Sequence, residues 1–296
     1  MPNPISNISM DEKSLACLSF ITTLAASKDP VIIGLSGIPG IGKTTLVKHL
    51  AQRLEENWGL ETLVFSIDDF YLPYEQQREL ARDHPQNKLL QYRGDPGTHD
   101  VPLLTEVLQT LADGKECFIP AYDKSAHHGR GDRVPENFWK RVNQPGKRVI
   151  RVVIFEGWCL GYRALSNIEV EEKWKGSSRT LKKHDLEHLL FVNEKLRELE
   201  VVYCYFDGFI YIDAMDPNWA YEWREQSENV LRVVKGPECA MSPAQVVEFV
   251  DGYFPAYELY AENLRKGVFR ESEDKPDKQL WLEVGEDRQV VKITRI

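Results

Sequence analysis

The sequence lacks several features that mark whole classes of proteins. Its five cysteines are scattered and include no C-x-x-C pair, so neither a disulfide framework nor a cysteine-based zinc site is expected. This use of cysteine favours reduced thiols in a cytoplasmic protein and leaves the nucleus open as a second location. No apolar run approaches the ~20 residues of a membrane span. The first residues are not rich in Arg and become acidic early, so we expect no signal or transit peptide.

An excess of positive charge is also missing. The chain has 37 Lys and Arg residues against 46 Asp and Glu residues, a formal net charge of −9. This balance argues against a nucleic-acid or membrane partner, although local Lys and Arg side chains can still line a pocket for a small anion. Internal repeats, low-complexity segments and dividing linkers are absent too. We therefore expect residues 1–296 to form one domain, of undetermined oligomeric state.

A glycine-rich segment organises the chain. The apolar residues 31–35 lead into residues 37–44, GIPGIGKT, which match the pattern G-x-x-x-x-G-K-[ST]. Its glycines let successive N–H groups point at a phosphate, Lys43 can reach the β- and γ-phosphates, and the Thr44 hydroxyl can ligate Mg²⁺. A helix predicted over residues 45–57 would begin at the phosphates. The predicted nucleotide-binding residues are Gly37, Ile38, Pro39, Gly40, Ile41, Gly42, Lys43, Thr44 and Thr45.

Two acidic residues follow the next predicted strand, residues 62–67. In open α/β sheets ligands bind at the carboxyl ends of strands, where Asp68 could take a proton from a substrate hydroxyl or help to hold a metal. For Asp69 two roles stay open, a substrate contact and a cap of the following turn. A third buried strand, residues 151–155, ends at Glu156, a carboxylate suited to Mg²⁺ in a P-loop protein.

Strands that alternate with helices predict the fold class. Further predicted elements are a helix from Ser9 or Asp11 to about Ser27, a strand over residues 209–212, a helix beginning at Ser242 that Pro255 interrupts, and a hairpin over residues 280–293. The sequence thus predicts an α/β protein with a P-loop NTPase fold. Its mostly parallel sheet is flanked by helices and carries lid and substrate-loop insertions.

Two segments between these elements are rich in side chains that could bind a substrate. Residues 93–100, RGDPGTHD, form a turn before a helix over 102–112 that Asp100 caps, and residues 117–148 read as a long, irregular, polar insertion. The alternatives are a plain structural turn and a solvated insertion. For an anionic substrate, Arg93, Lys124 and Arg130 are the candidate cations. The predicted substrate-binding residues are Asp69, Tyr71, Arg93, Thr98, His99, Asp100, Tyr122, Asp123, Lys124 and His127.

A helix over residues 219–234 could act as a lid, within a segment of about 217–234. Arg224 on this helix could close on the γ-phosphate and stabilise charge during transfer, or it could simply pair with a Glu one turn away. Residues 167–184 are highly charged, and we interpret them as a second insertion of uncertain order. Asp185 is then expected to cap a helix that ends at Leu199.

The motifs GLSGIPGIGKTT, SIDDFYLP, RGDPGTHD, IPAYDKSAHHGRGDR, VVIFEGW and YEWREQ, in this order, resemble the phosphoribulokinase/uridine kinase family of P-loop kinases. Within it they are similar to plant-type D-glycerate 3-kinases and their fungal relatives. The resemblance implies ATP and Mg²⁺, Asp68 as the base facing the acceptor hydroxyl, Glu156 as the acid after the third strand, and Arg224 in the lid. It implies a small hydroxylated acceptor, D-glycerate, in a pocket that includes Tyr122, Asp123, His127 and Asp100.

Other functions stay open at this point. A kinase of the same family could act on a nucleoside, a pantothenate-like compound or a sugar acid. A GTPase is disfavoured because the chain has no N-K-x-D segment. A non-catalytic ATP-binding adaptor would not need the set of Asp68, Glu156 and Arg224.

Overall fold

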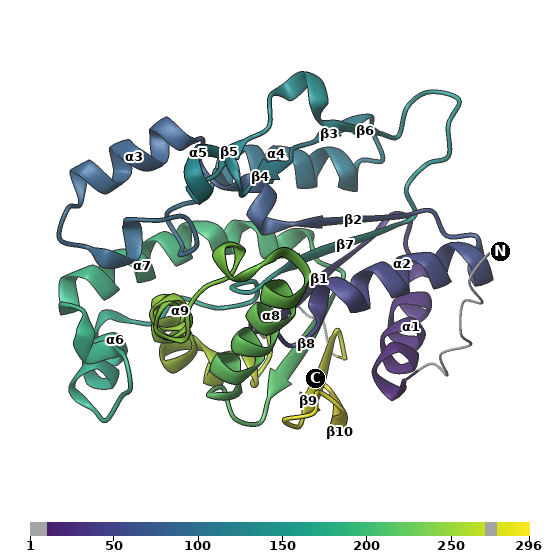
Figure 1. Cartoon of the computed structure of the whole chain (residues 1–296). Coiled ribbons are helices and arrows are strands. Elements are labelled where there is room, and N and C mark those ends of the chain that lie inside the picture. Colours follow the sequence, from purple (N-terminus) through teal and green to yellow (C-terminus); the bar gives the residue numbers. More distant parts are fainter. Residues whose placement is uncertain (1–10, 270–276) are drawn as a thin grey trace.

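A mostly parallel sheet forms the centre of the molecule (Figure 1). The computed structural model describes residues 11–269 and 277–296. The strand order is β10-β9-β8-β1-β7-β2, and all neighbours are parallel except β9 and β10, which form an antiparallel hairpin at one edge. The strands are β1 (Val31–Gly37), β2 (Thr62–Ser66), β7 (Val152–Gly157), β8 (Gly208–Ala214), β9 (Gln279–Val284) and β10 (Val290–Arg295).

Helices cover both faces of this sheet (Figure 1). Every residue of β1 and of β8 is buried, as expected for parallel strands enclosed between two helical layers. The helices are α1 (Glu12–Ala25), α2 (Lys43–Trp58), α3 (Tyr74–Asp83), α4 (Val101–Ala112), α5 (Ala126–Gly129), α6 (Asn167–Lys175), α7 (Leu186–Leu199), α8 (Trp219–Lys235) and α9 (Pro243–Leu264). The predicted fold class is confirmed.

The register of the sheet brings three predicted site segments to one edge. Glu156 on β7 lies opposite Leu35 of β1 on one side and Ser66 of β2 on the other. Glu156 is therefore inside the strand rather than after it, and the P-loop and Asp68 begin within two residues of its neighbours. This is the physical reason that ligand sites gather at the carboxyl ends of parallel strands.

The two predicted insertions are more regular than expected. Residues 117–148 contain two small antiparallel sheets, β3 (Cys117–Ile119) with β6 (Lys140–Val142) and β4 (Tyr122–Asp123) with β5 (Asp132–Arg133). Residues 167–184 contain α6, which begins with a capping box of Ser166 and Glu169. For residues 117–148 the irregular interpretation was wrong because strands of two or three residues leave no periodicity in a sequence.

The predictions of other helix boundaries had mixed outcomes. Asp11 caps α1 by accepting a hydrogen bond from the Ser14 N–H, whereas Ser9, the other candidate, lies outside the described residues. Asp185 stands before α7 but makes no side-chain capping bond. Pro255 does not interrupt α9, which runs through it. Pro255 is buried in the core, so tertiary packing offsets the hydrogen bond lost at the proline.

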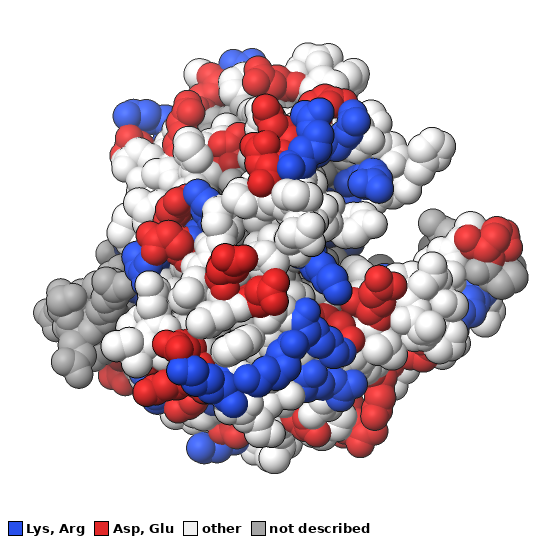
Figure 2. All heavy atoms as spheres, turned by 90° about the vertical axis from the view of Figure 1, so that its left-hand side faces the viewer, with Lys and Arg blue, Asp and Glu red and all other residues white. Residues whose placement is uncertain are grey.

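The surface carries charges of both signs. Figure 2 shows acidic and basic side chains interspersed over one face of the molecule, with one band of Lys and Arg side chains. In the part of the chain that the structure describes, no helix is long and apolar enough to cross a membrane. Recognition of an anion therefore depends on which basic side chains a particular pocket brings together.

Candidate active site

The P-loop connects β1 to α2 as the motif predicts. Gly40 and Gly42 have φ values of +85° and +99°, in the left-handed region that glycine adopts without strain. Gly42 is the N-cap of α2 and offers no capping side chain, so the first N–H groups of the helix remain available to an anion. Lys43 folds over the loop, and its Nζ donates to the Gly37 carbonyl at 2.6 Å. The segment has the form of a phosphate cradle.

The pKa of Lys43 reflects the carboxylates near it. Burial lowers the pKa of the Lys43 ammonium, and the nearby carboxylates of Glu156 and Asp68 partly offset that effect. The Glu156 carboxylate accepts no hydrogen bond from any residue that the structure describes. The exposed Thr44 hydroxyl makes none with these residues either. Carboxylate and hydroxyl oxygens are ligands that Mg²⁺ prefers, so Thr44 and Glu156 fit the predicted metal role.

Asp68 lies in a 3₁₀ turn, Ile67–Phe70, that follows β2 directly. Its Oδ1 accepts a hydrogen bond from the Tyr71 hydroxyl at 2.9 Å, and its Oδ2 accepts one from Lys124 Nζ at 2.5 Å. Burial alone would raise the pKa of Asp68, but the Lys124 charge and these hydrogen bonds lower it overall. The carboxylate is thus ionised. Because both of its oxygens are occupied, Asp68 fits a metal role less well than Glu156 does.

Of the two roles left open for Asp69, the structure shows the cap. Ser66 and Asp69 form a capping box, in which the Asp69 Oδ2 accepts from the Ser66 N–H at 3.0 Å. This pairing holds the turn that presents Asp68.

The turn at residues 93–100 packs beside Asp68. His99 stacks on Tyr71 with ring centroids 4.8 Å apart, and both of its ring nitrogens are buried without a hydrogen-bond partner. Burial lowers the pKa of His99 to about 4, so the ring is neutral at pH 7. Thr98 is different, because its buried hydroxyl donates to the Asp95 carbonyl inside the turn. His99 can face a ligand, whereas Thr98 holds the turn.

Both carboxylate oxygens of Asp100 accept hydrogen bonds from other residues of the chain. Its Oδ1 caps α4 by accepting from the Leu103 N–H at 3.1 Å, and its Oδ2 accepts from Arg133 Nη1 at 2.9 Å. Arg133 also donates to the Tyr71 carbonyl, so this pair ties the 117–148 segment to the Asp68 turn. The capping interpretation of Asp100 therefore describes Oδ1, and the pair with Arg133 engages Oδ2.

The 117–148 segment brings Tyr122 and Lys124 to Asp68. Tyr122 packs edge-on against Tyr71 at 5.4 Å between ring centroids, and Lys124 pairs with Asp68. Arg93 stabilises the segment from outside, since it donates to the carbonyls of Lys124, Gly129 and Arg130. Arg93 thereby shapes the loop.

Two other residues of this segment make contacts of their own. Asp123 accepts from the N–H and the hydroxyl of Ser125. His127 stacks on Tyr74 at 3.7 Å and its Nε2 lies 3.1 Å from Asp132. In this conformation neither side chain contacts Asp68.

Arg224 on α8 is folded back on its own helix. Its Nη2 donates to Glu228 Oε1 at 2.5 Å, and the guanidinium lies 4.5 Å from the Phe249 ring centroid. This is the i,i+4 pair of the alternative interpretation, although Glu228 is buried rather than exposed. A lid role for Arg224 would need this pair to open.

The sequence interpretation missed contacts that come from the C-terminal part of the chain. Trp223 is fully buried against the P-loop, where a Cβ on Gly40 would lie 2.7 Å from the Trp223 Cβ. Arg288, in the β9–β10 turn, donates to the Gly40 carbonyl at 2.8 Å. Tyr253 on α9 reaches the 93–100 turn. Trp223 belongs to the motif YEWREQ, but its contact with the P-loop leaves no local signal, and Tyr253 and Arg288 belong to no motif.

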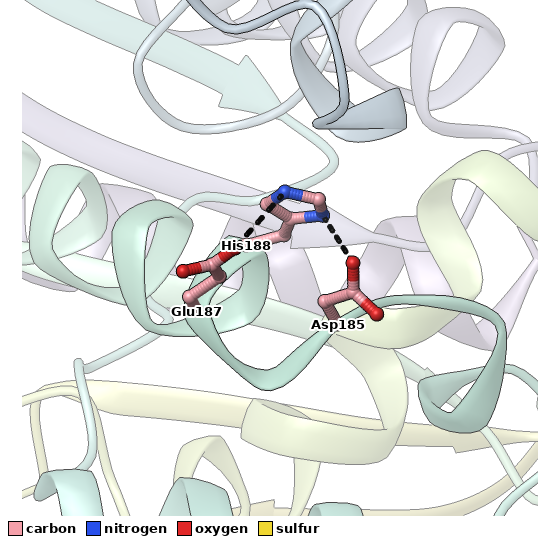
Figure 3. A group of neighbouring side chains, drawn as sticks. All are labelled: Asp185, Glu187 and His188. Carbon is pink, nitrogen blue, oxygen red and sulfur yellow. Dashed lines mark ion pairs between the residues drawn. The ribbon is translucent and has the colours of Figure 1, made fainter.

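A separate group of possible metal ligands lies at the start of α7 (Figure 3). The carboxylates of Asp185 and Glu187 approach opposite ring nitrogens of His188, at 3.9 and 4.0 Å. The two exposed carboxylates face different nitrogens of the half-buried His188 ring, so the three side chains do not converge on one point, and they lie on a different element from the P-loop and Asp68.

The chain is similar to known kinases in sequence and in fold. The sequence profile of the phosphoribulokinase/uridine kinase family matches residues 32–164. An uncharacterised kinase of Schizosaccharomyces pombe, mug58, is 38% identical over 81% of this chain and 84% of its own. The chloroplastic D-glycerate 3-kinase of Arabidopsis thaliana is 36% identical over 88% of this chain, which spans only 53% of the length of that enzyme.

A solved structure extends the comparison to the fold. The D-glycerate 3-kinase of Cryptococcus neoformans var. grubii superposes with a TM-score of 0.86 and 30% sequence identity, over 97% of this chain and all of that one. The similarity therefore includes the C-terminal helices and hairpin as well as the motifs.

Proposed function

This chain belongs to the phosphoribulokinase/uridine kinase family, and on that premise we propose that it transfers the γ-phosphate of ATP to a hydroxyl of D-glycerate. One observation carries the proposal. Asp68 is an ionised carboxylate at the end of β2, next to the P-loop lysine and held by Tyr71 and Lys124. The names of the plant and fungal D-glycerate 3-kinases support the choice of acceptor.

In the proposed reaction, Asp68 takes the proton of the acceptor hydroxyl as its oxygen bonds to the γ-phosphorus. The bond between that phosphorus and the bridging oxygen of ADP breaks, and the negative charge passes to ADP. Lys43 and the N-terminal N–H groups of α2 stabilise charge on the transferred group. Arg224 would add a further cation when its pair with Glu228 opens.

Mg²⁺ fits this site through Thr44 and Glu156, whose side-chain oxygens make no hydrogen bond with any described residue. When bound, Mg²⁺ offsets charge on the phosphates. Asp68 acts as the base once an oxygen held by Tyr71 or Lys124 exchanges that partner for the acceptor hydroxyl.

The cations around Asp68 suit an acceptor that carries a carboxylate. Lys124 contacts Asp68 directly and is exposed, so its ammonium can turn toward a second anion. Arg93 supports the carbonyls of the same loop, and Arg130 lies over the Tyr92 ring. Lys124 is accordingly the proposed contact for the glycerate carboxylate, with Arg93 and Arg130 positioning its loop.

Replacement of the base tests the proposal. Asp68→Asn should lower the turnover of D-glycerate by about 10²–10⁴-fold, the usual contribution of a general base, while ATP affinity measured by calorimetry stays within a few fold of wild type. Lys43→Ala is the matched comparison, because it should weaken ATP binding as well as turnover. A wild-type kcat for Asp68→Asn would refute the assignment of the base.

The acceptor is tested separately with an ATP-consumption assay over glycerate, pantothenate, nucleosides and sugar acids. Preference for glycerate is expected. Turnover of another compound would replace the acceptor and keep the kinase mechanism, whereas tight ATP binding without turnover of any compound would favour an adaptor.

A further inference from the structure

Four arginines line a cavity to which the mechanism above assigns no ligand. The cavity measures about 320 Å³ and lies between α3, the segment that leads into the 93–100 turn, and the end of α5. The arginines are Arg78, Arg82, Arg93 and Arg130, and none of the residues that line the cavity is acidic. Its volume lies at the lower end of the range typical of small-molecule sites. A cavity of this size and charge suits a small anion.

Most of these guanidinium groups have no carboxylate partner, although the chain has more acidic than basic residues. Arg78 pairs with the exposed Glu75 at 3.2 Å. Arg82 makes no ion pair or hydrogen bond with any residue that the structure describes. The guanidinium of Arg130 lies 5.4 Å from the centroid of the Tyr92 ring and forms no ion pair with these residues. Because like charges in one cavity repel each other, this arrangement calls for a ligand with more than one anionic group.

Arg93 has donors to spare for such a ligand. Its guanidinium donates three hydrogen bonds to carbonyls of the neighbouring loop, those of Lys124, Gly129 and Arg130. A guanidinium has five N–H donors, so these three bonds leave two of them for another acceptor. The carbonyls hold the group in place together with the Tyr122 ring, whose centroid is 5.4 Å away. Arg93 is therefore an anion contact that is already oriented before a ligand binds.

A buried amide in the same cavity calls for a hydroxyl as well. Gln77 is 7% exposed, and its Nε2 donates to the Leu90 carbonyl at 2.9 Å, which fixes the orientation of the amide. The Gln77 Oε1 is buried and accepts no hydrogen bond from the described residues. Because Gln77 lines the cavity, a ligand with a hydroxyl beside it supplies the missing donor.

The cavity is separate from the proposed reaction site. Neither the P-loop nor Asp68 nor Lys124 lines it. α3 lies beside the loop that carries Lys124 because Tyr74, its first residue, stacks on His127 of α5 at 3.7 Å between ring centroids (Figure 1). A ligand in the cavity therefore contacts α3 and the outer side of this loop, and not the groups that take part in phosphate transfer.

We propose that this cavity is a second anion site, which binds a hydroxylated compound with two phosphate groups, such as a sugar bisphosphate. The proposal goes beyond the proposed function and does not depend on the acceptor. One phosphate group pairs with Arg78 and Arg82, which lie four residues apart on α3 and hence on one face of this helix. The other pairs with Arg93 and Arg130, and a hydroxyl between them donates to Gln77 Oε1.

Calorimetry with D-fructose 1,6-bisphosphate tests the site in the full chain. Saturating ADP and Mg²⁺ keep the P-loop occupied during the titration. We expect saturable binding of one equivalent, weakened about tenfold or more in Arg78→Gln and in Arg82→Gln, because each variant loses a charged donor to phosphate. Two controls should bind the probe as wild type does. Lys124→Gln removes the cation beside Asp68, and Arg53→Gln removes an arginine of α2.

A second compound tests the hydroxyl contact. Hexane-1,6-diol bisphosphate carries two terminal phosphate groups on six carbons and has no hydroxyl on its carbon chain. We expect it to bind about tenfold or more weakly than the sugar bisphosphate. In Gln77→Met, which keeps the length of the side chain without its acceptor, the ratio of the two affinities should fall toward one. This comparison within one variant separates the hydroxyl contact from the greater flexibility of the diol compound.

The outcomes are distinct. Both α3 variants should keep the ATP affinity of wild type, which shows that they fold. Absence of saturable binding to wild type overturns the proposal, and so does equal binding of the probe by wild type and both α3 variants. An unchanged ratio of the two bisphosphates in Gln77→Met overturns the hydroxyl contact. These results are independent of the acceptor, which the ATP-consumption assay tests by itself.

Discussion

The contact between the C-terminal hairpin and the P-loop leads to a quantitative prediction. Arg288 Nε donates to the Gly40 carbonyl at 2.8 Å, and its Nη2 donates to Gln226 Oε1 at 2.8 Å. Its guanidinium also lies 4.9 Å from the ring centroid of Trp223, the residue whose Cβ and backbone lie against Gly40. Removal of this side chain leaves the sequence of the P-loop intact but takes away one support of its backbone.

The size of the effect follows from these contacts. A hydrogen bond from a charged donor contributes about 1.5–3 kcal/mol, and a partly exposed cation over an aromatic ring contributes about 0.5–1 kcal/mol. Arg288 is half-exposed, so solvent screens these contributions, and only part of them acts on the nucleotide-binding conformation. We expect a loss of about 1–2 kcal/mol in ATP binding, which corresponds to a five- to thirtyfold higher Kd.

Two variants and one control make the measurement specific. Arg288 has φ of +64°, so Arg288→Gly removes the side chain and suits the backbone, whereas Arg288→Ala keeps the strained conformation. Both should weaken ATP binding in calorimetry by similar amounts. Lys292→Ala removes a cation from β10 of the same hairpin and should bind ATP as wild type does. Wild-type affinity in both Arg288 variants would refute the reasoning that this contact holds the P-loop.

Two further predictions concern pH and thiol chemistry. Burial lowers the pKa of His99 to about 4. Below pH 6.5 the unfolded chain therefore binds a proton at His99 that the native state does not bind. This residue should lower the free energy of unfolding by about 2–3 kcal/mol between pH 6.5 and pH 4. His99→Gln should flatten that part of a urea-unfolding series, and equal pH slopes in the two proteins would contradict the burial argument. A thiol reagent should modify the exposed Cys204 and Cys239 rapidly in the native protein, and the three other cysteines only after unfolding, as mass spectrometry of the labelled protein can show.

The sequence alone predicted the parts of the molecule that depend on local pattern. The apolar runs before Gly37, Asp68 and Asp213 carry enough β-branched and aromatic residues to be recognised as buried strands, although the last strand runs from Gly208 to Ala214 and so includes Asp213. The P-loop needs only its glycines and Lys43 in the right order after a strand. Motif order then identified the family, which the comparisons confirmed.

Local pattern was insufficient where the outcome depends on residues distant in sequence. Pro255 continues α9 because its neighbours are buried, and the strands of residues 117–142 exist only because they pair with one another. For Asp69 and Asp100 the sequence allowed both a cap and a substrate contact. The capping bonds of the folded chain show that their oxygens are engaged within the protein.

The sequence by itself determined that the chain has a P-loop at one end of a parallel sheet, with acids at the ends of two neighbouring strands. Only the tertiary structure decided which other side chains meet them. Gly94 and Tyr253 are separated by more than half of the chain, as are Gly40 and Arg288, and no spacing rule connects them. Their contacts arise because α9 and the C-terminal hairpin fold back onto the sheet, which brings residues that are distant in sequence into contact beside the site.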